Sequence, residues 1–275
     1  MLGKLLKYDF RSMFKYWWIA AISSLALSLL GGICIAAASS EKELPAIVSV
    51  MCSMILILII FGFVAFSILS MIFIFARFYK NFFTDEGYLT FTLPVKNNQL
   101  LNSKLISSTV TLCLTGVVLI LNIVVMFLIG FADSIFTKEF WDEISIIFKE
   151  IINTLGIYSA VYVLEILILL VLSTIFSILF MFCCITFASI ITKKAKVITA
   201  IGIYYGANSI LSFMVQIFFL FGIDSISNWM IKLPENKEMA VIALIMLGII
   251  LFIALFCGLL YTLQYWMLDR KLNLN

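Results

Sequence analysis

Six long stretches of this chain contain no Asp, Glu, Lys or Arg. They lie between Lys15 and Glu41, Glu43 and Arg77, Lys104 and Asp133, Glu165 and Lys193, Lys196 and Asp224, and Glu238 and Asp269. A helix needs about 20 apolar residues to cross the roughly 30 Å hydrocarbon core of a bilayer, and each stretch is at least that long. The composition, 64% hydrophobic and 12% charged, agrees with this pattern. The sequence therefore predicts an all-α membrane protein with six transmembrane helices.

The charged residues that flank these stretches set the predicted bounds of the helices. Spans are expected near residues 17–39, 45–76, 105–131, 164–192, 197–222 and 239–267, within a single domain, 1–275. Most of the 18 Lys and Arg residues fall in 1–16, 77–104, 193–196 and after Asp269, which lie on one side of the membrane. Because cytoplasmic loops are enriched in Lys and Arg, both termini are expected in the cytoplasm. The net charge of +3 thus reflects topology, and no nucleic-acid partner is expected.

The segment before the first span has two faces. Through residues 1–16, and up to Trp17, apolar residues recur every three or four positions, whereas Lys4, Lys7, Arg11 and Lys15 occupy the opposite face. A helix divided in this way lies in the membrane interface, with its cations toward the headgroups of anionic membrane lipids. It is expected to turn from there into the first span. The alternative is a simple basic flank that only orients the first span.

The segment 77–104 is the longest predicted cytoplasmic connection. It mixes aromatic and charged residues, has a turn signal at Asp85-Glu86-Gly87, and contains Pro94. A mere connection needs only a few polar residues. Such a segment is typical of a short helix and turn that docks on a partner. The alternative is that its aromatic residues anchor the loop at the headgroup layer.

The order of residues in this segment resembles the membrane subunits of the ABC type-2 exporter family. An acidic residue and glycine are followed by Leu-Pro-Val, paired aliphatic residues, a small residue and lysine, at Glu86, Gly87, Leu93, Pro94, Val95, Leu100, Leu101, Ser103 and Lys104. The run DEGYLTFTLPV is most similar to the small permeases of Gram-positive bacteria. The separation between the glycine and the proline is shorter than in the common form of the motif.

This resemblance implies an architecture and a set of partners. The segment from Phe82 to Leu101 would sit in a groove of a separate ATP-binding cassette subunit, which would bind ATP and Mg²⁺. A second permease copy or a sister permease would complete the transporter in the bacterial plasma membrane. The residues expected at the ATPase contact are Phe82, Phe83, Asp85, Glu86, Gly87, Tyr88, Phe91 and Pro94.

The chain is not expected to be an enzyme. The sequence contains no Gly-x-x-x-x-Gly-Lys-Ser/Thr phosphate loop, no histidine and no CxxC pair, so ATP hydrolysis and the common metal-dependent or Ser-His chemistries lack their residues. The expected function is export of an amphipathic or lipid-like cargo, such as an antimicrobial peptide. The alternative is a non-transporting membrane binding or sensor subunit, such as the substrate-capture component of an importer.

Glu165 is the one ionisable acid or base within a predicted apolar region. Intramembrane carboxylates are costly, so a substrate-binding or gating role is one hypothesis. The other is a hydrogen bond to Tyr162 or Tyr158, one and two helical turns earlier. The expected position near the outer interface leaves both open.

Two spans carry polar residues at helical spacing. The third has Ser108, Thr111, Thr115 and Asn122 on one face, and the fifth has Tyr205, Asn208, Ser212 and Gln216. Such faces avoid lipid, so they indicate helix packing or a translocation path. Gly202 and Gly206 form a GxxxG pair that favours close helix contact.

The segment 138–155 predicts an amphipathic helix outside the membrane. One face carries Phe140, Ile144, Ile147, Phe148, Ile151, Ile152 and Leu155, and charged residues share the other. Such a helix either flanks an exit portal or rests on the bilayer.

Overall fold

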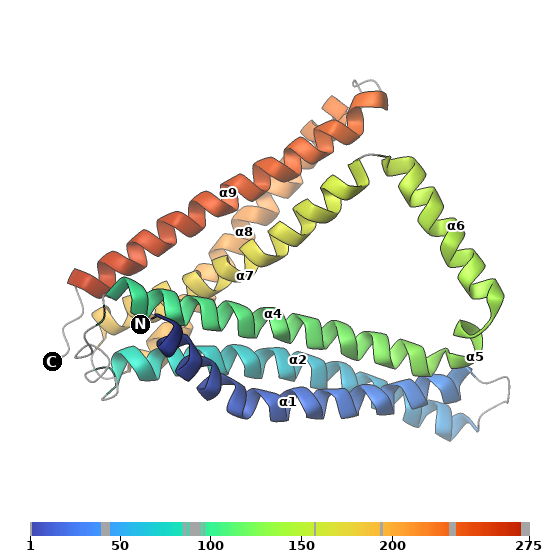
Figure 1. The fold of residues 1–275 in the computed structure, drawn as a ribbon, viewed down its shortest axis with the longest axis horizontal. Coiled ribbons are helices and arrows are strands. Elements are labelled where there is room, and N and C mark those ends of the chain that lie inside the picture. Colours follow the sequence, from blue (N-terminus) through green and yellow to red (C-terminus); the bar gives the residue numbers. More distant parts are fainter. Residues whose placement is uncertain are drawn as a thin grey trace. The chain divides into compact units, whose positions relative to one another are not determined.

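The computed structural model describes residues 2–39, 45–84, 87, 95, 97–156, 158–192, 195–230 and 235–270. Across these residues the regular structure is entirely helical. The helices are α1 (Leu2–Ser39), α2 (Ala46–Phe83), α4 (Asn97–Gly130), α5 (Ala132–Ile135), α6 (Lys138–Leu155), α7 (Tyr158–Ile191), α8 (Lys196–Met230) and α9 (Glu235–Arg270). Figure 1 shows their course along the chain.

Six of these helices, α1, α2, α4, α7, α8 and α9, are long and apolar enough to cross a membrane. The prediction of an all-α protein with six membrane-spanning helices is therefore confirmed. All six are longer than the predicted spans, however, and run 34 to 38 residues. Lys, Arg and Glu are good helix formers, so a charged residue marks the edge of the hydrocarbon without ending the helix.

The predicted interfacial helix, 1–16, and the first span form one continuous helix, α1, which bends along its length (Figure 1). The two faces of its first turns are separated as expected. Lys4, Lys7, Arg11 and Lys15 are exposed, whereas Met13 and Trp17 are 5% and 1% exposed. The apolar face thus packs against protein from Met13 onward.

The sequence predicts one domain, and the contacts of the chain group into two compact units. One unit contains Met1–Arg77 and Ile106–Asn153, and the other contains Phe78–Leu105 and Thr154–Asn275. The helices α2 and α4 contribute residues to both.

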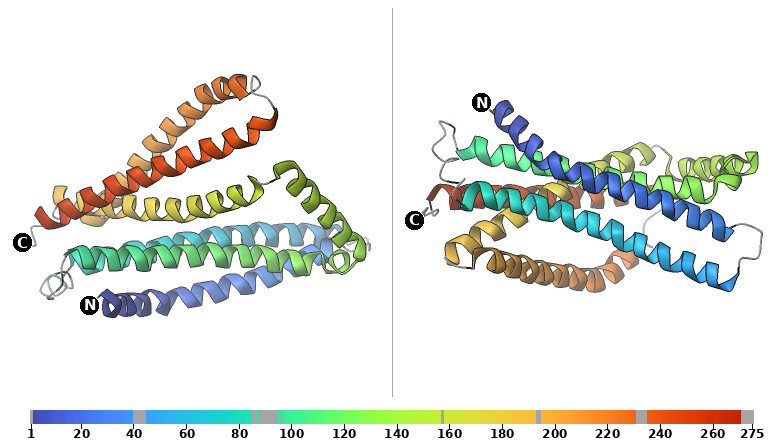
Figure 2. Two further views of the ribbon diagram at one scale, coloured as in Figure 1. Left: turned by 45° about the horizontal axis from the view of Figure 1, so that its top comes forward. Right: turned by 90° about the horizontal axis from the view of Figure 1, so that it is seen from below.

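In the first unit, α1, α2 and α4 run side by side (Figures 1 and 2). Its core is built around Trp17, Ala21 and Phe66, with partly buried Leu114 and Val118 packed against them. Further along α1 the backbone approaches α4 closely. A Cβ atom added at Gly32 would lie 2.6 Å from Ile129 Cβ. Small residues let membrane helices approach at such distances.

In the second unit, α7 packs against both α8 and α9. Because α8 returns the chain, α7 and α9 run parallel, and residues about 77 apart in sequence face each other. The Tyr162 hydroxyl donates a hydrogen bond to the Met239 carbonyl at 2.7 Å, and the Cys183 thiol lies 3.5 Å from the Leu260 carbonyl. Many residues from Ile178 to Ala188 are buried.

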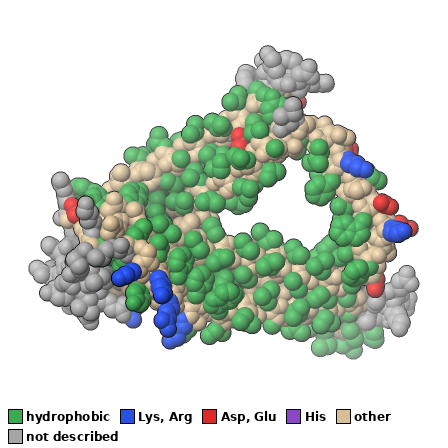
Figure 3. Space-filling view, in the orientation of Figure 1, with side chains coloured by type: hydrophobic (Ala, Val, Ile, Leu, Met, Phe, Trp, Pro, Cys, Tyr) green, Lys and Arg blue, Asp and Glu red, His purple; other side chains and the backbone are tan. Residues whose placement is uncertain are grey.

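The outer surface agrees with a membrane environment. Figure 3 shows hydrophobic side chains over most of the visible face, with Lys and Arg grouped over the first part of α1 and over α6. Water would not solvate such a surface, whereas hydrocarbon would.

Candidate functional site

The candidate site is the hairpin between α2 and α4, together with the helices that it contacts in the second unit. Of the predicted coupling residues, Phe82, Phe83 and Gly87 are described by the structure. Asp85, Glu86, Tyr88, Phe91 and Pro94 lie outside the described residues.

An aromatic cluster fixes the end of α2 to α7. The Phe78 and Phe182 rings stack with centroids 3.7 Å apart and an interplanar angle of 8°. Phe82 lies one turn after Phe78, and the centroids of the two rings are 4.9 Å apart. The Phe82 side chain is 1% exposed. Phe82 therefore supports the hairpin from within and presents almost no surface to a partner. Phe83 is partly exposed, with its ring 5.9 Å from that of Tyr79.

Gly87 closes a tight turn directly after α2. Its N–H donates a hydrogen bond to the Thr84 carbonyl at 2.7 Å. A Cβ atom at this position would lie 2.7 Å from the Phe82 carbonyl oxygen. Since real side chains do not approach a backbone atom so closely, glycine is required for the turn to pack against the last turn of α2.

Polar contacts fix the start of α4 to α9. The Asn97 side-chain amide donates a hydrogen bond to Asp269 Oδ1 at 3.1 Å. The Tyr261 hydroxyl lies 2.8 Å from Asn102 Oδ1 and also contacts Asn98 Oδ1. The hairpin is thereby attached to a helix more than 150 residues away in the sequence.

The residues around these polar contacts on α4 are buried. Leu100, Leu101 and Ser103 are 1%, 0% and 0% exposed, and Lys104 is 6% exposed. These are residues on which the family resemblance rests, and their burial gives a structural reason for a Leu-Leu-x-Ser-Lys pattern. The sequence alone did not indicate that Asn97 and Asn102 contact α9.

A buried hydrogen bond joins α7 and α9 close to this cluster. Gln264 Nε2 donates to Thr186 Oγ1 at 2.7 Å, and that hydroxyl donates to the Phe182 carbonyl at 2.9 Å. Phe182 thus contacts the end of α2 through its ring and receives a hydrogen bond that links it to α9. The arrangement can carry a displacement of the hairpin into both helices.

Glu165 lies farther along α7, toward the helix start, and is 5% exposed. Among the residues that the structure describes, its Oε2 atom has no hydrogen-bond partner. The Tyr162 hydroxyl donates its hydrogen bond to the Met239 carbonyl and not to Glu165, as the sequence had suggested. A binding or gating role for Glu165 stays a hypothesis.

The polar stripe of the third span faces α1. Asn122 is 0% exposed and donates from Nδ2 to Ser24 Oγ at 3.0 Å. Trp17 Nε1 donates to Thr115 Oγ1 at 3.0 Å. These contacts favour helix packing as the role of this stripe.

The polar stripe of the fifth span differs, because the described chain leaves it open. Tyr205 is 65% exposed, and Asn208 and Gln216 are also exposed. A Cβ atom at Gly202 or Gly206 would meet nothing within 4 Å. Among the described residues, therefore, no other helix makes the predicted close contact at the GxxxG pair.

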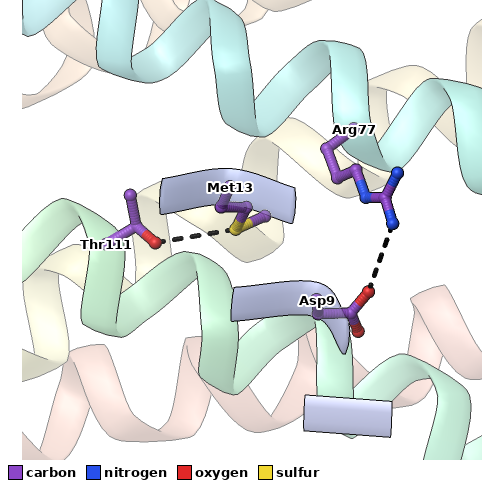
Figure 4. A network of polar contacts seen from close by, with 4 residues as sticks. All are labelled: Asp9, Met13, Arg77 and Thr111. Atoms are coloured by element: carbon purple, nitrogen blue, oxygen red, sulfur yellow. Dashed lines mark hydrogen bonds and ion pairs between the residues drawn. The ribbon is translucent and has the colours of Figure 1, made fainter. Parts of the chain in front are cut away.

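Sequence reasoning missed an ion pair in the first unit. Asp9 of α1 is 3% exposed, and its Oδ1 lies 3.9 Å from an Arg77 nitrogen (Figure 4). Thr111 of α4 donates to the Met13 sulfur at 3.5 Å one turn away. The available signal was the spacing of Asp9, Met13 and Trp17, which places an acid on the buried face of a basic segment.

Comparisons with protein-family models, with curated proteins and with solved structures give no match for this chain. The fold itself defines the class: a multi-pass membrane protein built from α-helices, with six apolar helices that can span the bilayer.

Proposed function

We propose that this chain is the permease subunit of an ATP-driven ABC exporter. The observation that supports it most is the attachment of the hairpin to two other helices, through the Phe78–Phe182 stack and the contacts of Asn97 and Tyr261 with their partners. A loop held in this way moves together with α7 and α9. It suits the transfer of a partner's conformational change to the membrane.

The partner in this proposal is a separate ATP-binding cassette subunit, which binds ATP and Mg²⁺. The tip of the hairpin docks on that subunit in this proposal, while Phe82, which is buried, transmits the movement. Gly87 sets the shape of the turn. The chain itself contributes no nucleotide-binding residue.

A second permease copy or a sister permease completes the transporter. The open face of α8 supports this part of the proposal, since amide side chains such as Asn208 and Gln216 are costly against hydrocarbon. A neighbouring permease that packs on this face satisfies them and makes use of the small residues Gly202 and Gly206.

The cargo in this proposal is an amphipathic or lipid-like molecule, such as an antimicrobial peptide, that leaves the cell or the membrane. The site of action is the bacterial plasma membrane, with both chain termini in the cytoplasm. The exposed basic residues Lys4, Lys7, Arg11 and Lys15 support this orientation.

Copurification tests the proposal. A tagged chain is purified from its native cells in mild detergent, and ATPase activity and bound subunits are measured. The wild-type chain is expected to retain an ATPase subunit, and the combined change of Tyr88, Phe91 and Pro94 to Ala is expected to lose it. Phe148→Ala in α6 is the control, because it lies outside the hairpin and is expected to keep the subunit.

A second variant separates docking from transmission. Tyr261→Phe removes only the hydroxyl that contacts Asn98 and Asn102, so the ATPase subunit is expected to remain bound while cargo-stimulated ATPase activity and peptide resistance fall. If no ATPase subunit accompanies the wild-type chain under conditions that preserve the complex, the exporter proposal fails.

Within the described part of the chain, Glu165 Oε2 has no hydrogen-bond partner, and this favours the second candidate, a non-transporting binding or sensor subunit. That function places the working site in the outer half of α7. Glu165→Gln would then abolish ligand binding, whereas changes to the hairpin would have no effect on it.

A further inference from the structure

The helix α6 exposes a complete apolar face. None of its residues is buried, and Trp141, Phe148 and Ile151 are 59%, 63% and 48% exposed. With 3.6 residues per turn, eight apolar residues fall within an arc of about 140°. They are Phe140, Trp141, Ile144, Ile147, Phe148, Ile151, Ile152 and Leu155. Water is a poor solvent for this face, so something in the native environment covers it.

Both ends of α6 are tied to the membrane on the same side. The helix lies between α4 and α7, which are consecutive membrane spans, so the intervening chain begins and ends at one bilayer surface. The last turns of α4 already expose Phe127 and Leu128 at 45% and 49%, and the first turns of α7 expose Val163 and Leu164 at 60% and 58%. Both spans therefore present apolar side chains close to the point where they meet the connecting segment.

The chain does not continue from α6 into α7 as one helix, because the helix is broken between them. Gly156 has φ of +53°, the left-handed conformation that ends helices, directly after Leu155. Residues 156 and 157 can span only about 7 Å. An 18-residue helix is about 27 Å long. If α6 stood perpendicular to the bilayer, one of its ends would lie far from the bilayer surface, although both ends are joined to membrane spans at that surface.

The charges on the polar face of α6 indicate which kind of lipid covers its apolar face. The helix carries two lysines, Lys138 and Lys149, and four carboxylates, those of Glu139, Asp142, Glu143 and Glu150. This balance offers no attraction to anionic headgroups, unlike the basic face of α1. Burial of apolar area, aided by Trp141 at the headgroup level, is the remaining driving force.

We propose that α6 lies flat in the membrane interface, with its apolar face among neutral lipids of the leaflet opposite the hairpin. The two ties to the membrane, the break at Gly156 and the uncovered apolar face all favour this placement. The inference does not depend on the exporter function, since it uses only the spans and α6 itself.

Site-directed spin labelling tests this placement with two matched positions. Phe148 and Asn153 are both exposed, but they lie on opposite faces of α6. Phe148→Cys and Asn153→Cys are labelled with a nitroxide in a full chain whose six native cysteines are replaced by Ala, and are placed in phosphatidylcholine vesicles. Accessibility to oxygen, which dissolves in the bilayer, is compared with accessibility to a water-soluble nickel complex.

The label at position 148 is expected to show an oxygen-to-nickel ratio several-fold higher than the label at 153. The ratio is expected to stay the same when part of the phosphatidylcholine is replaced by phosphatidylglycerol. High nickel accessibility at both positions would place α6 in water and overturn the proposal. Low accessibility to both reagents with spin coupling between chains would assign the face to a second copy, and a requirement for phosphatidylglycerol would contradict the neutral-lipid assignment.

The chain with its native cysteines supplies an independent measurement. In vesicles of brominated phosphatidylcholine, Trp141→Phe is expected to remove a strongly quenched component of the tryptophan fluorescence. Loss of an unquenched component would instead show that Trp141 lies away from the lipid chains, contrary to the proposal.

Discussion

The close contact between α1 and α4 makes a sharp prediction about two glycines. Gly32→Ala introduces a Cβ atom 2.6 Å from Ile129 Cβ and 3.2 Å from the Met126 carbonyl oxygen. Gly202→Ala introduces the same atom in a span where nothing lies within 4 Å. Both positions are inside helices and neither has a positive φ, so the two variants differ in packing alone.

The magnitude follows from this matched pair. Replacing glycine by alanine within a helix stabilises the folded protein by about 0.5–1 kcal/mol at either position. Carbon atoms prefer separations of about 3.5–4.0 Å, so α1 and α4 must move apart by about 1 Å at Gly32. Overpacking of this kind costs about 1–3 kcal/mol. Because the helix contribution cancels, Gly32→Ala is expected to be less stable than Gly202→Ala by about that amount.

Thermal unfolding in mild detergent measures the difference. The six cysteines are free, so their reaction with a thiol-reactive fluorophore reports unfolding. Gly31→Ala should be milder than Gly32→Ala, because its nearest neighbour is the flexible end of Met126, at 2.9 Å. If Gly32→Ala is as stable as Gly202→Ala, the reasoning about the helix contact is refuted.

Three further predictions use the same unfolding measurement. Trp17→Phe removes the buried hydrogen bond to Thr115 and is expected to lower the free energy of unfolding by about 0.5–1.5 kcal/mol. Trp18→Phe, at a side chain that is 57% exposed, should change it little. Equal effects of the two variants would contradict the assignment of this hydrogen bond. Phe182→Ala deletes a ring that is 0% exposed and should cost about 3–5 kcal/mol, so a loss below 1 kcal/mol would count against the stack in the second unit. Arg77→Met takes a cation from the buried Asp9 carboxylate and should cost about 1–3 kcal/mol; adding Asp9→Asn should recover part of this loss, and a further loss would argue against the ion pair.

The number and type of membrane helices could be predicted because absence of charge over more than 20 residues has few other structural outcomes. The lengths of the helices could not. Arg77 and Lys80 both lie within α2, since a charged side chain at the membrane edge can extend into water while the backbone stays helical.

The candidate site could be predicted only in part. The loop pattern located the hairpin, but its attachment to α9 depends on residues such as Asn98 and Tyr261 that carry no local signal of pairing.

Glycine motifs show the same limit. Gly202 and Gly206 match GxxxG, yet a Cβ atom at either would meet none of the described residues within 4 Å, whereas Gly32 lies against Ile129 without matching the motif. The neighbour that faces a glycine decides the contact, and spacing along one helix does not specify that neighbour.

The length of α2 has a consequence for any protein that approaches from the hairpin side. From Arg77 to its end at Phe83 the helix continues for about 10 Å beyond the uncharged segment. The last turns of α2 therefore extend past the charged residue that marks the edge of the hydrocarbon. A large soluble protein can contact the end of α2 without first displacing the water and ions that coat the bilayer.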